Sequence, residues 1–175
     1  MIKYTLKIVE IVDQAKGTKT YYLEKPEDLT CGPGTHTHIA HVGYDVGEVP
    51  NKKWVRPMSI MTLQQEGKIG FTTRVPGGCS EFKEKLSQLR VGDEVVLYKL
   101  GSRMALRCND RPIVFFTMGI GVTAVLTDIL NYVKDKTGIP ALTHLNVEAS
   151  RDFVFRSKLD PLTDAQYQKQ AHLWN

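Results

Sequence analysis

Arg56-Pro57-Met58-Ser59 is followed, about twenty residues later, by Gly77-Gly78-Cys79-Ser80. These two stretches decide how the rest of the sequence is interpreted. The first places an arginine in a β-type segment, and Pro57 restricts that segment to a sheet edge because proline donates no ladder hydrogen bond. The second opens an amphipathic run, residues 80–90, in which Ser80 suits a helix N-cap. A guanidinium fork and the free N–H groups of a helix N-terminus both suit a diphosphate. The two stretches therefore predict a diphosphate site between a rim strand and a helix.

Short β-type segments surround these two stretches. Alternating or β-branched residues occur at 4–12, 18–23, 35–42, 54–63, 68–75 and 94–100, separated by turn signals such as Glu66-Gly67. The interruption is the helical run at 80–90, where Phe82, Leu86 and Leu89 share one face. Short strands at such intervals predict a β-barrel or a β-sandwich.

The pattern changes after Asp110-Arg111-Pro112. Residues 113–116 are a continuous apolar strand, 122–136 carry apolar residues at helical spacing, and 141–147 are a second buried strand. The turn Gly119-Ile120-Gly121-Val122-Thr123 has the context of a dinucleotide-binding turn, although it lacks the third glycine of the Rossmann fingerprint. This β-turn-α-β unit predicts the start of a parallel nucleotide-binding sheet. We place the domain boundary so that residues 1–108 form one domain and 109–175 the next.

Size, charge and cysteine content narrow the class of protein. The chain has 175 residues, 42% of them hydrophobic, which is enough for a real core. Basic and acidic residues are interleaved, so the net charge of +4 does not favour nucleic-acid binding. No apolar stretch approaches the roughly 18 residues of a membrane span, and the N-terminus lacks a signal-peptide core. Three cysteines without metal-ligand spacing fit reduced thiols, so we expect a cytoplasmic protein.

Three histidines, His36, His38 and His41, raise the question of a metal site. His36 and His38 share one face of a predicted strand. No thiol or carboxylate lies nearby in the sequence to complete a coordination sphere. We therefore interpret them as barrel residues and predict no metal.

Read in order, these motifs resemble the ferredoxin-NADP reductase family, together with Phe71-Thr72-Thr73-Arg74-Val75 and Gly92-Asp93. The resemblance covers about residues 4–147. It implies a β plus α/β architecture, in which an antiparallel six-stranded flavin-binding barrel precedes a parallel nucleotide-binding α/β domain. That second domain is expected to be incomplete, because in the family it typically runs well beyond the length present here. Two residues depart from the pattern: Met58 stands where the family usually has an aromatic residue, and Ala124 where proline commonly follows the threonine.

The resemblance also implies which residues bind the cofactors. The FAD set is Arg56, Pro57, Met58, Ser59, Thr72, Thr73, Arg74, Gly78, Cys79 and Ser80, and the nicotinamide-nucleotide set is Gly119, Gly121, Val122 and Thr123. Arg56 and the backbone of 78–80 would hold the pyrophosphate, and residues 72–74 would line the ribityl side. Ser59 would take the catalytic place near the flavin N5.

The implied activity is that of an FAD-dependent oxidoreductase that uses NADP or NAD. It would exchange electrons with a one-electron carrier such as a ferredoxin or a flavodoxin, with no nucleic acid and no membrane among its partners. Two alternatives stay open. One is a flavin-binding electron-transfer module that does not itself use nicotinamide, and the other is a degenerate domain that keeps only the fold.

Overall fold

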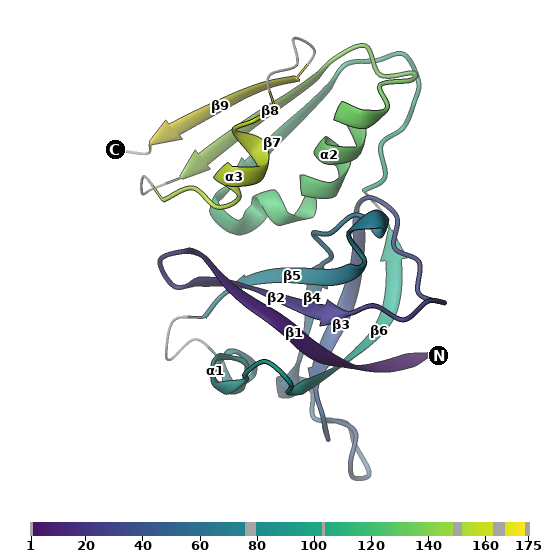
Figure 1. Cartoon of the computed structure of the whole chain (residues 1–175), viewed down its shortest axis with the longest axis vertical. Helices are drawn as coiled ribbons and strands as arrows, with labels where there is room; N and C mark the ends of the chain where they lie inside the picture. The colour runs from purple at the N-terminus through teal and green to yellow at the C-terminus, as the bar shows by residue number, and fades with distance from the viewer. Residues whose placement is uncertain (1, 76–79, 103, 149–151, 163–166, 174–175) are drawn as a thin grey trace.

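The computed structural model describes residues 2–75, 80–102, 104–148, 152–162 and 167–173, the last range as backbone only (Figure 1). Within these residues, a six-stranded sheet is followed along the chain by a three-stranded sheet with helices. The predicted fold class, a β unit and then an α/β unit, is confirmed.

The first sheet is antiparallel throughout, in the order β4-β3-β6-β1-β2-β5. Its strands are β1 (Lys3–Ala15), β2 (Thr18–Glu24), β3 (Thr35–His41), β4 (Val55–Ser59), β5 (Lys68–Arg74) and β6 (Glu94–Ser102). The edge position of β4 confirms the prediction made from Pro57. The strand predicted at 54–63 is shorter than expected, because the chain changes partner soon after Ser59. The Ile60 amide still donates to the Thr35 carbonyl of β3, but the Met61 amide donates to β5.

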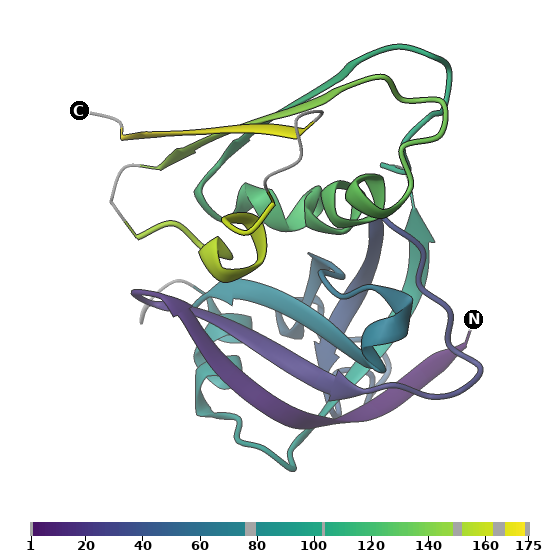
Figure 2. The ribbon, with the colours of Figure 1, turned by 45° about the horizontal axis from the view of Figure 1, so that its top comes forward.

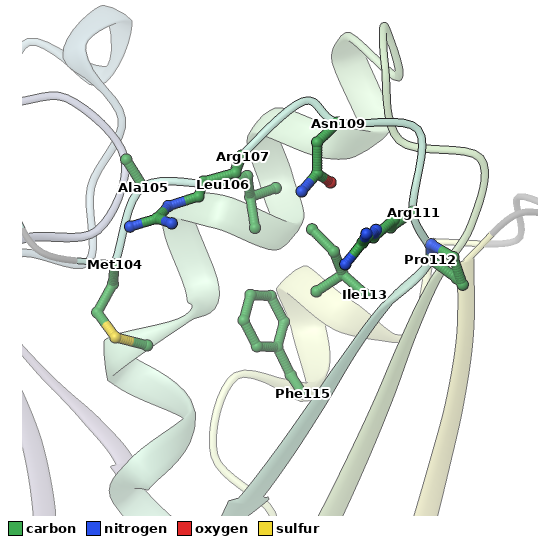
Figure 3. A pocket seen from close by; sticks show the side chains of 9 residues that line it. All are labelled: Met104, Ala105, Leu106, Arg107, Asn109, Arg111, Pro112, Ile113 and Phe115. Atoms are coloured by element: carbon green, nitrogen blue, oxygen red, sulfur yellow. The ribbon is translucent and has the colours of Figure 1, made fainter.

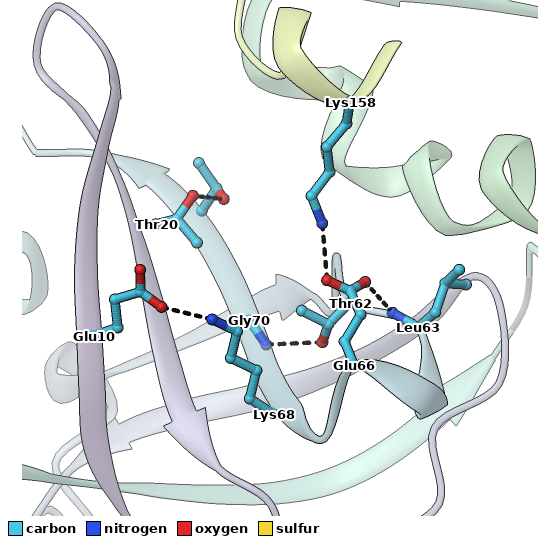
Figure 4. A network of polar contacts seen from close by, with 9 residues as sticks. Glu10, Thr20, Thr62, Leu63, Glu66, Lys68, Gly70 and Lys158 are labelled. Carbon is cyan, nitrogen blue, oxygen red and sulfur yellow. Dashed lines mark hydrogen bonds and ion pairs between the residues drawn. The ribbon is translucent and has the colours of Figure 1, made fainter. Parts of the chain in front are cut away.

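The curled sheet is drawn together where its two edges approach. Just after β4, the Met61 amide donates to the Gly70 carbonyl of β5 at 2.8 Å. The Gly70 amide donates in turn to the Thr62 hydroxyl at 2.9 Å (Figure 4). A Cβ on Gly70 would lie 2.6 Å from the Met61 sulfur, so only glycine permits this approach without a shift. Of the predicted barrel and sandwich, the structure has the barrel.

One apolar core fills the barrel, and α1 (Glu81–Gln88) packs against it. Phe82 and Leu86 of α1 are fully buried, which confirms the helix face predicted from their spacing. Barrel side chains in this core include Ile8, Tyr21, Leu23, Ile39, Ile69, Phe71 and Leu97. The helix is therefore held in place by the same core that supports β4 and β5.

The second sheet is parallel, with the order β7 (Ile113–Met118), β8 (Leu142–Glu148) and β9 (Tyr167–Leu173). A 3-10 helix, η3 (Gly119–Ala124), and α2 (Leu126–Lys134) connect β7 to β8, and α3 (Arg156–Leu159) precedes β9. Figures 1 and 2 both place α2 and α3 between this sheet and the barrel. The parallel β-turn-α-β unit is confirmed, whereas α3 and β9 were not predicted.

The helix predicted at 122–136 is shorter and begins later. Its first residues belong to η3, where the Thr123 hydroxyl donates to the Ile120 carbonyl at 2.9 Å. Val125, with φ −116° and ψ −4°, separates this turn from α2. The side-chain bond competes with regular helical backbone geometry, so the α-helix starts only at Leu126.

The two faces of β7 differ in burial. Ile113 and Phe115 pack into the core on the side of α2. Val114, Phe116 and Met118 point the other way and are 63%, 69% and 69% exposed. Parallel sheets are usually covered on both faces, so this open apolar face is unusual.

A shared core joins the two units. Tyr22 and Met61 of the barrel belong to the same buried cluster as the apolar side chains of α2. Lys158 of α3 adds a polar link, with its ammonium 3.0 Å from the Glu66 carboxylate after β4 (Figure 4). The division of the chain at residue 108 stays a prediction.

Candidate cofactor-binding site

Arg56 lies beside the N-terminal turn of α1. Its guanidinium carbon is 6.0 Å from the ring centre of Phe82, the second residue of the helix. One guanidinium nitrogen donates to the Val55 carbonyl at 2.7 Å, which steadies the side chain along β4. The structure thus brings the arginine and the helix start together, and their role toward a diphosphate stays a prediction.

The first turn of α1 keeps part of its donor capacity. Ser80 is the N-cap: its hydroxyl accepts from the Lys83 amide at 3.4 Å, and its carbonyl accepts from the Glu84 amide at 2.9 Å. The amides of Glu81 and Phe82 donate to none of the described residues. Such amides, at the positive end of the helix dipole, attract anions.

Glu81 in this turn would repel an anion if its carboxylate faced the free amides. Instead, the carboxylate accepts from the Trp54 indole N–H at 2.5 Å. Lys85, whose ammonium lies 4.2 Å from the Trp54 ring centre, adds a cation to the same contact. The Glu81 carboxylate is therefore engaged by the Trp54 indole.

The other predicted residues of β4 have different surroundings. Met58 packs against the barrel core, so its side chain is partly used for packing. Pro57 is exposed and lies opposite His38, while Ser59 is half-buried at the end of the strand, opposite His36. Gly78 and Cys79, which were predicted to complete the clamp, lie outside the described residues.

Only one of the three predicted side chains on β5 reaches outward. The Thr72 hydroxyl is 2.6 Å from that of Thr20, and both residues are buried. Thr73 is buried too, and its hydroxyl donates to the Arg74 carbonyl at 3.4 Å. Arg74 extends to the second unit, where its guanidinium lies 3.6 Å from the Glu148 carboxylate.

This ion pair lies against the glycine turn that follows β7. Gly119 has φ +54°, and a Cβ there would come within 2.9 Å of the Arg74 guanidinium and 3.2 Å of the Glu148 carboxylate. Gly121 borders open space, whereas Val122 is buried in the core. The structure therefore brings Arg74 and Gly119 together, but Val122 faces the core and its side chain is not available to a ligand.

Sequence reasoning missed Glu148. It is the last residue of β8, and the carboxyl ends of neighbouring parallel strands meet at one edge of a sheet, where nucleotides bind in such folds. An acidic residue at that position was the signal available in the sequence. Its partner Arg74 is distant in the chain, so the pairing itself could not have been predicted.

A buried polar group lies on β7 and β8, on the face toward the helices. The Thr117 hydroxyl is 2.8 Å from the His144 imidazole and 3.0 Å from the Asn146 amide oxygen. Burial lowers the pKa of His144 to about 4, so its ring is neutral at physiological pH. These residues support the carboxyl edge of the sheet and do not reach its surface.

Comparison with known proteins identifies the architecture. No family model matches the sequence, and no curated protein matches it. Solved structures do match, among them the CS-b5R domains of human Ncb5or in the NAD+ form, with a TM-score of 0.77 and 18% identity. That match covers 99% of this chain and 54% of the other. The chain has the fold of ferredoxin-NADP reductase-like domains.

Two further structures support this fold. The FAD/NAD-binding domain of a Vibrio cholerae nitric oxide dioxygenase matches with a TM-score of 0.78 and 20% identity, over 98% of this chain and 74% of that one. A Neisseria gonorrhoeae ferredoxin-NADP+ reductase with bound FAD and NADP matches with a TM-score of 0.79 and 12% identity, over 97% and 67%. The chain thus spans about half of the Ncb5or structure and a larger share of these two.

Two other kinds of feature are absent from the described residues. No described helix is both long and apolar enough to cross a bilayer. Among the described residues, no group of three or more His, Cys, Asp or Glu side chains is arranged to hold a metal ion.

Proposed function

We propose that this chain binds FAD, with the pyrophosphate held between Arg56 and the first turn of α1. The observation that carries the proposal is the pairing of a half-buried guanidinium with two helix amides that donate to none of the described residues. The contact of Glu81 with Trp54 supports it, because it takes the nearest carboxylate away from the anion. A bound FAD would supply the redox chemistry, and the residues of this chain would hold and orient it.

We further propose that the protein passes electrons between NAD(P)H and a one-electron carrier such as a ferredoxin or a flavodoxin. The nicotinamide nucleotide would approach Gly119 and Gly121 at the carboxyl edge of the parallel sheet, the usual ligand position in open α/β sheets. Ser59 would lie near the reacting flavin atoms at the end of β4. The fold shared with a reductase that binds FAD and NADP supports this assignment.

One observation favours the alternative of a flavin module that does not use nicotinamide. The Glu148 carboxylate lies against Gly119, where a dinucleotide phosphate would approach, and like charges repel. Arg74 offsets this charge only partly, since its side chain is half exposed. Anaerobic titration of the FAD-loaded protein with NADH and NADPH separates the two functions: bleaching of the flavin absorbance supports the reductase, and no bleaching supports the module.

Arg56→Ala tests the FAD site. Losing a charged hydrogen bond should weaken FAD binding by about 1.5–3 kcal/mol, or roughly 10- to 150-fold in Kd. The dissociation constant is measured by quenching of flavin fluorescence, with circular dichroism to check the fold.

Arg90→Ala is the matched control, because Arg90 is exposed and follows the end of α1. It removes the same charge and should leave the Kd unchanged. Equal FAD affinity in the wild type and Arg56→Ala would show that Arg56 is not part of the site. Failure of the wild type to bind FAD would favour the alternative of a degenerate domain that keeps only the fold.

A further inference from the structure

A cavity lies away from the residues assigned to FAD. It has a volume of about 370 Å³ and lies between Pro33 of the turn before β3, Ala105 and Leu106 of the linker after β6, and one face of α2. Ala105 and Leu106 also border a neighbouring cavity of about 400 Å³, seen in Figure 3. The smaller cavity shares no lining residue with the proposed flavin site.

Asp128 of α2 is the unusual residue in this cavity. It lines the cavity, yet its side chain is 0% exposed, and neither carboxylate oxygen has a hydrogen-bond partner among the described residues. One oxygen lies 3.1 Å from the place where a Cβ on Gly34 would be, so the carboxyl group is pressed against the barrel turn. A buried carboxyl group without a partner is costly, and native proteins rarely keep one without a use.

The remaining lining makes the cavity acidic. Asn131 follows Asp128 at i+3 on the same side of α2 and contributes an amide. Asp135, the C-cap residue just after α2, contributes a second carboxylate. Asp135 is exposed, and hydrogen bonds from the Thr137 side chain and from the Thr137 amide, the latter at 3.0 Å, lower its pKa. Among the described residues, no lysine or arginine lines this cavity, whereas Arg107 and Arg111 line the neighbouring one. A negative mouth with a carboxyl group behind it favours entry of a cation.

The size and composition of the cavity favour an organic cation over a metal ion. No group of three metal-ligating side chains occurs among the described residues, and a single ion would leave most of the volume unfilled. Pro33, Leu106 and the buried Ile139 offer apolar surface to an alkyl chain.

We propose that this cavity binds a small organic cation whose ammonium or guanidinium group pairs with Asp128. Asp135 attracts the cation at the mouth, and the apolar wall packs against its carbon chain. Because each Asp128 oxygen exposes less than 1 Å², pairing requires the carboxyl group to rotate toward the cavity. The site goes beyond the redox function proposed above and uses other residues.

The protonation state of Asp128 gives a second test of the proposal, the pH dependence of binding. Burial raises the pKa of Asp128 to about 7. Among the described residues that line the cavity, the other titratable groups are Asp135, which follows α2, and Cys108 of the linker. A cation pairs with the ionised carboxylate, so binding should be tighter at pH 8 than at pH 6.

Agmatine, which carries a guanidinium and an ammonium group, is the probe for this site, with n-butanol as the uncharged comparison. Isothermal titration calorimetry on the full chain should show agmatine binding and no binding of n-butanol. Asp128→Asn keeps the shape and removes the charge, and it should weaken agmatine binding by about tenfold or more, the effect of losing a charged hydrogen bond. Amide NMR shifts should map the probe to residues 105–108 and 128–135.

Glu48→Gln is the control, because Glu48 is an exposed carboxylate in the loop between β3 and β4, far in sequence from every residue that lines the cavity, and it should leave agmatine binding unchanged. Absence of agmatine binding to the wild type, or equal binding to Asp128→Asn, would overturn the proposal. The FAD dissociation constant of Asp128→Asn should match the wild type, so failure here is distinguishable from failure of the flavin site.

Discussion

Gly70 shows how one residue controls closure of the barrel. The β4 and β5 edges meet at this position, and any side chain here would press on Met61 and Thr62. Gly70→Ala places a Cβ 2.6 Å from the Met61 sulfur and 2.9 Å from a Thr62 methyl group. Overpacking of this kind should lower the free energy of unfolding by about 1–3 kcal/mol, measured by urea denaturation.

Gly32→Ala is the comparison for this prediction. A Cβ on Gly32 has no heavy atom within 4 Å, and the residue is exposed. Its substitution should change stability by no more than about 0.5 kcal/mol, as expected for a surface site. If both variants lost equal stability, the close approach at Gly70 would not be the cause.

Replacing a phenylalanine by alanine should cost much more stability on the helix α1 than on the strand β7. Phe82→Ala on α1 empties a fully buried position and should cost about 3–5 kcal/mol. Phe116→Ala on β7 removes a ring that is 69% exposed and should cost less than about 1 kcal/mol. Guanidinium denaturation of both variants measures the difference. A large cost for Phe116→Ala would mean that the outer face of the sheet is covered in solution.

Elements with a strong local pattern could be predicted from the sequence. The buried face of α1 follows from the spacing of Phe82 and Leu86, and the edge position of β4 follows from Pro57. The four-residue helix α3 is too short for a periodic signal, and it starts after Phe155, which has φ +60°. Local propensity does not predict a phenylalanine with a left-handed backbone conformation.

Within the candidate site, the same limit separates what could be predicted from what could not. The approach of Arg56 to α1 agrees with the motif order, because the Arg56–Ser59 motif and the amphipathic run at 80–90 could each be recognised in the sequence. The contact of Glu81 with Trp54 and the pairing of Arg74 with Glu148 depend on tertiary folding. The burial of Asp128 is equally nonlocal, since a helix pattern alone does not say which turn of the barrel lies against it.

At the scale of the whole molecule, two buried groups have opposite effects on stability as pH changes. Between about pH 4 and 6.5 the folded chain keeps a proton on Asp128 that the unfolded chain releases, so this group makes stability fall as pH rises. Over the same range the unfolded chain protonates His144 while the folded chain keeps it neutral, so this group makes stability rise. The two effects oppose each other.

Asp128→Asn separates these effects. The variant lacks the proton on Asp128, so its free energy of unfolding relative to the wild type should increase with pH. The slope should be about 1.4 kcal/mol per pH unit between pH 4.5 and 6.5. Urea unfolding across this range provides the measurement, and a difference that does not change with pH would contradict the raised pKa of Asp128.

The position of Tyr22 and Met61 in a cluster shared with α2 has a mechanical consequence. Hinge opening between the barrel and the helical layer would wet both side chains, so the two halves should move as one body and melt in a single cooperative transition. A fragment ending after β6 would expose these side chains to solvent. We expect it to aggregate more readily and to be less stable than the intact chain.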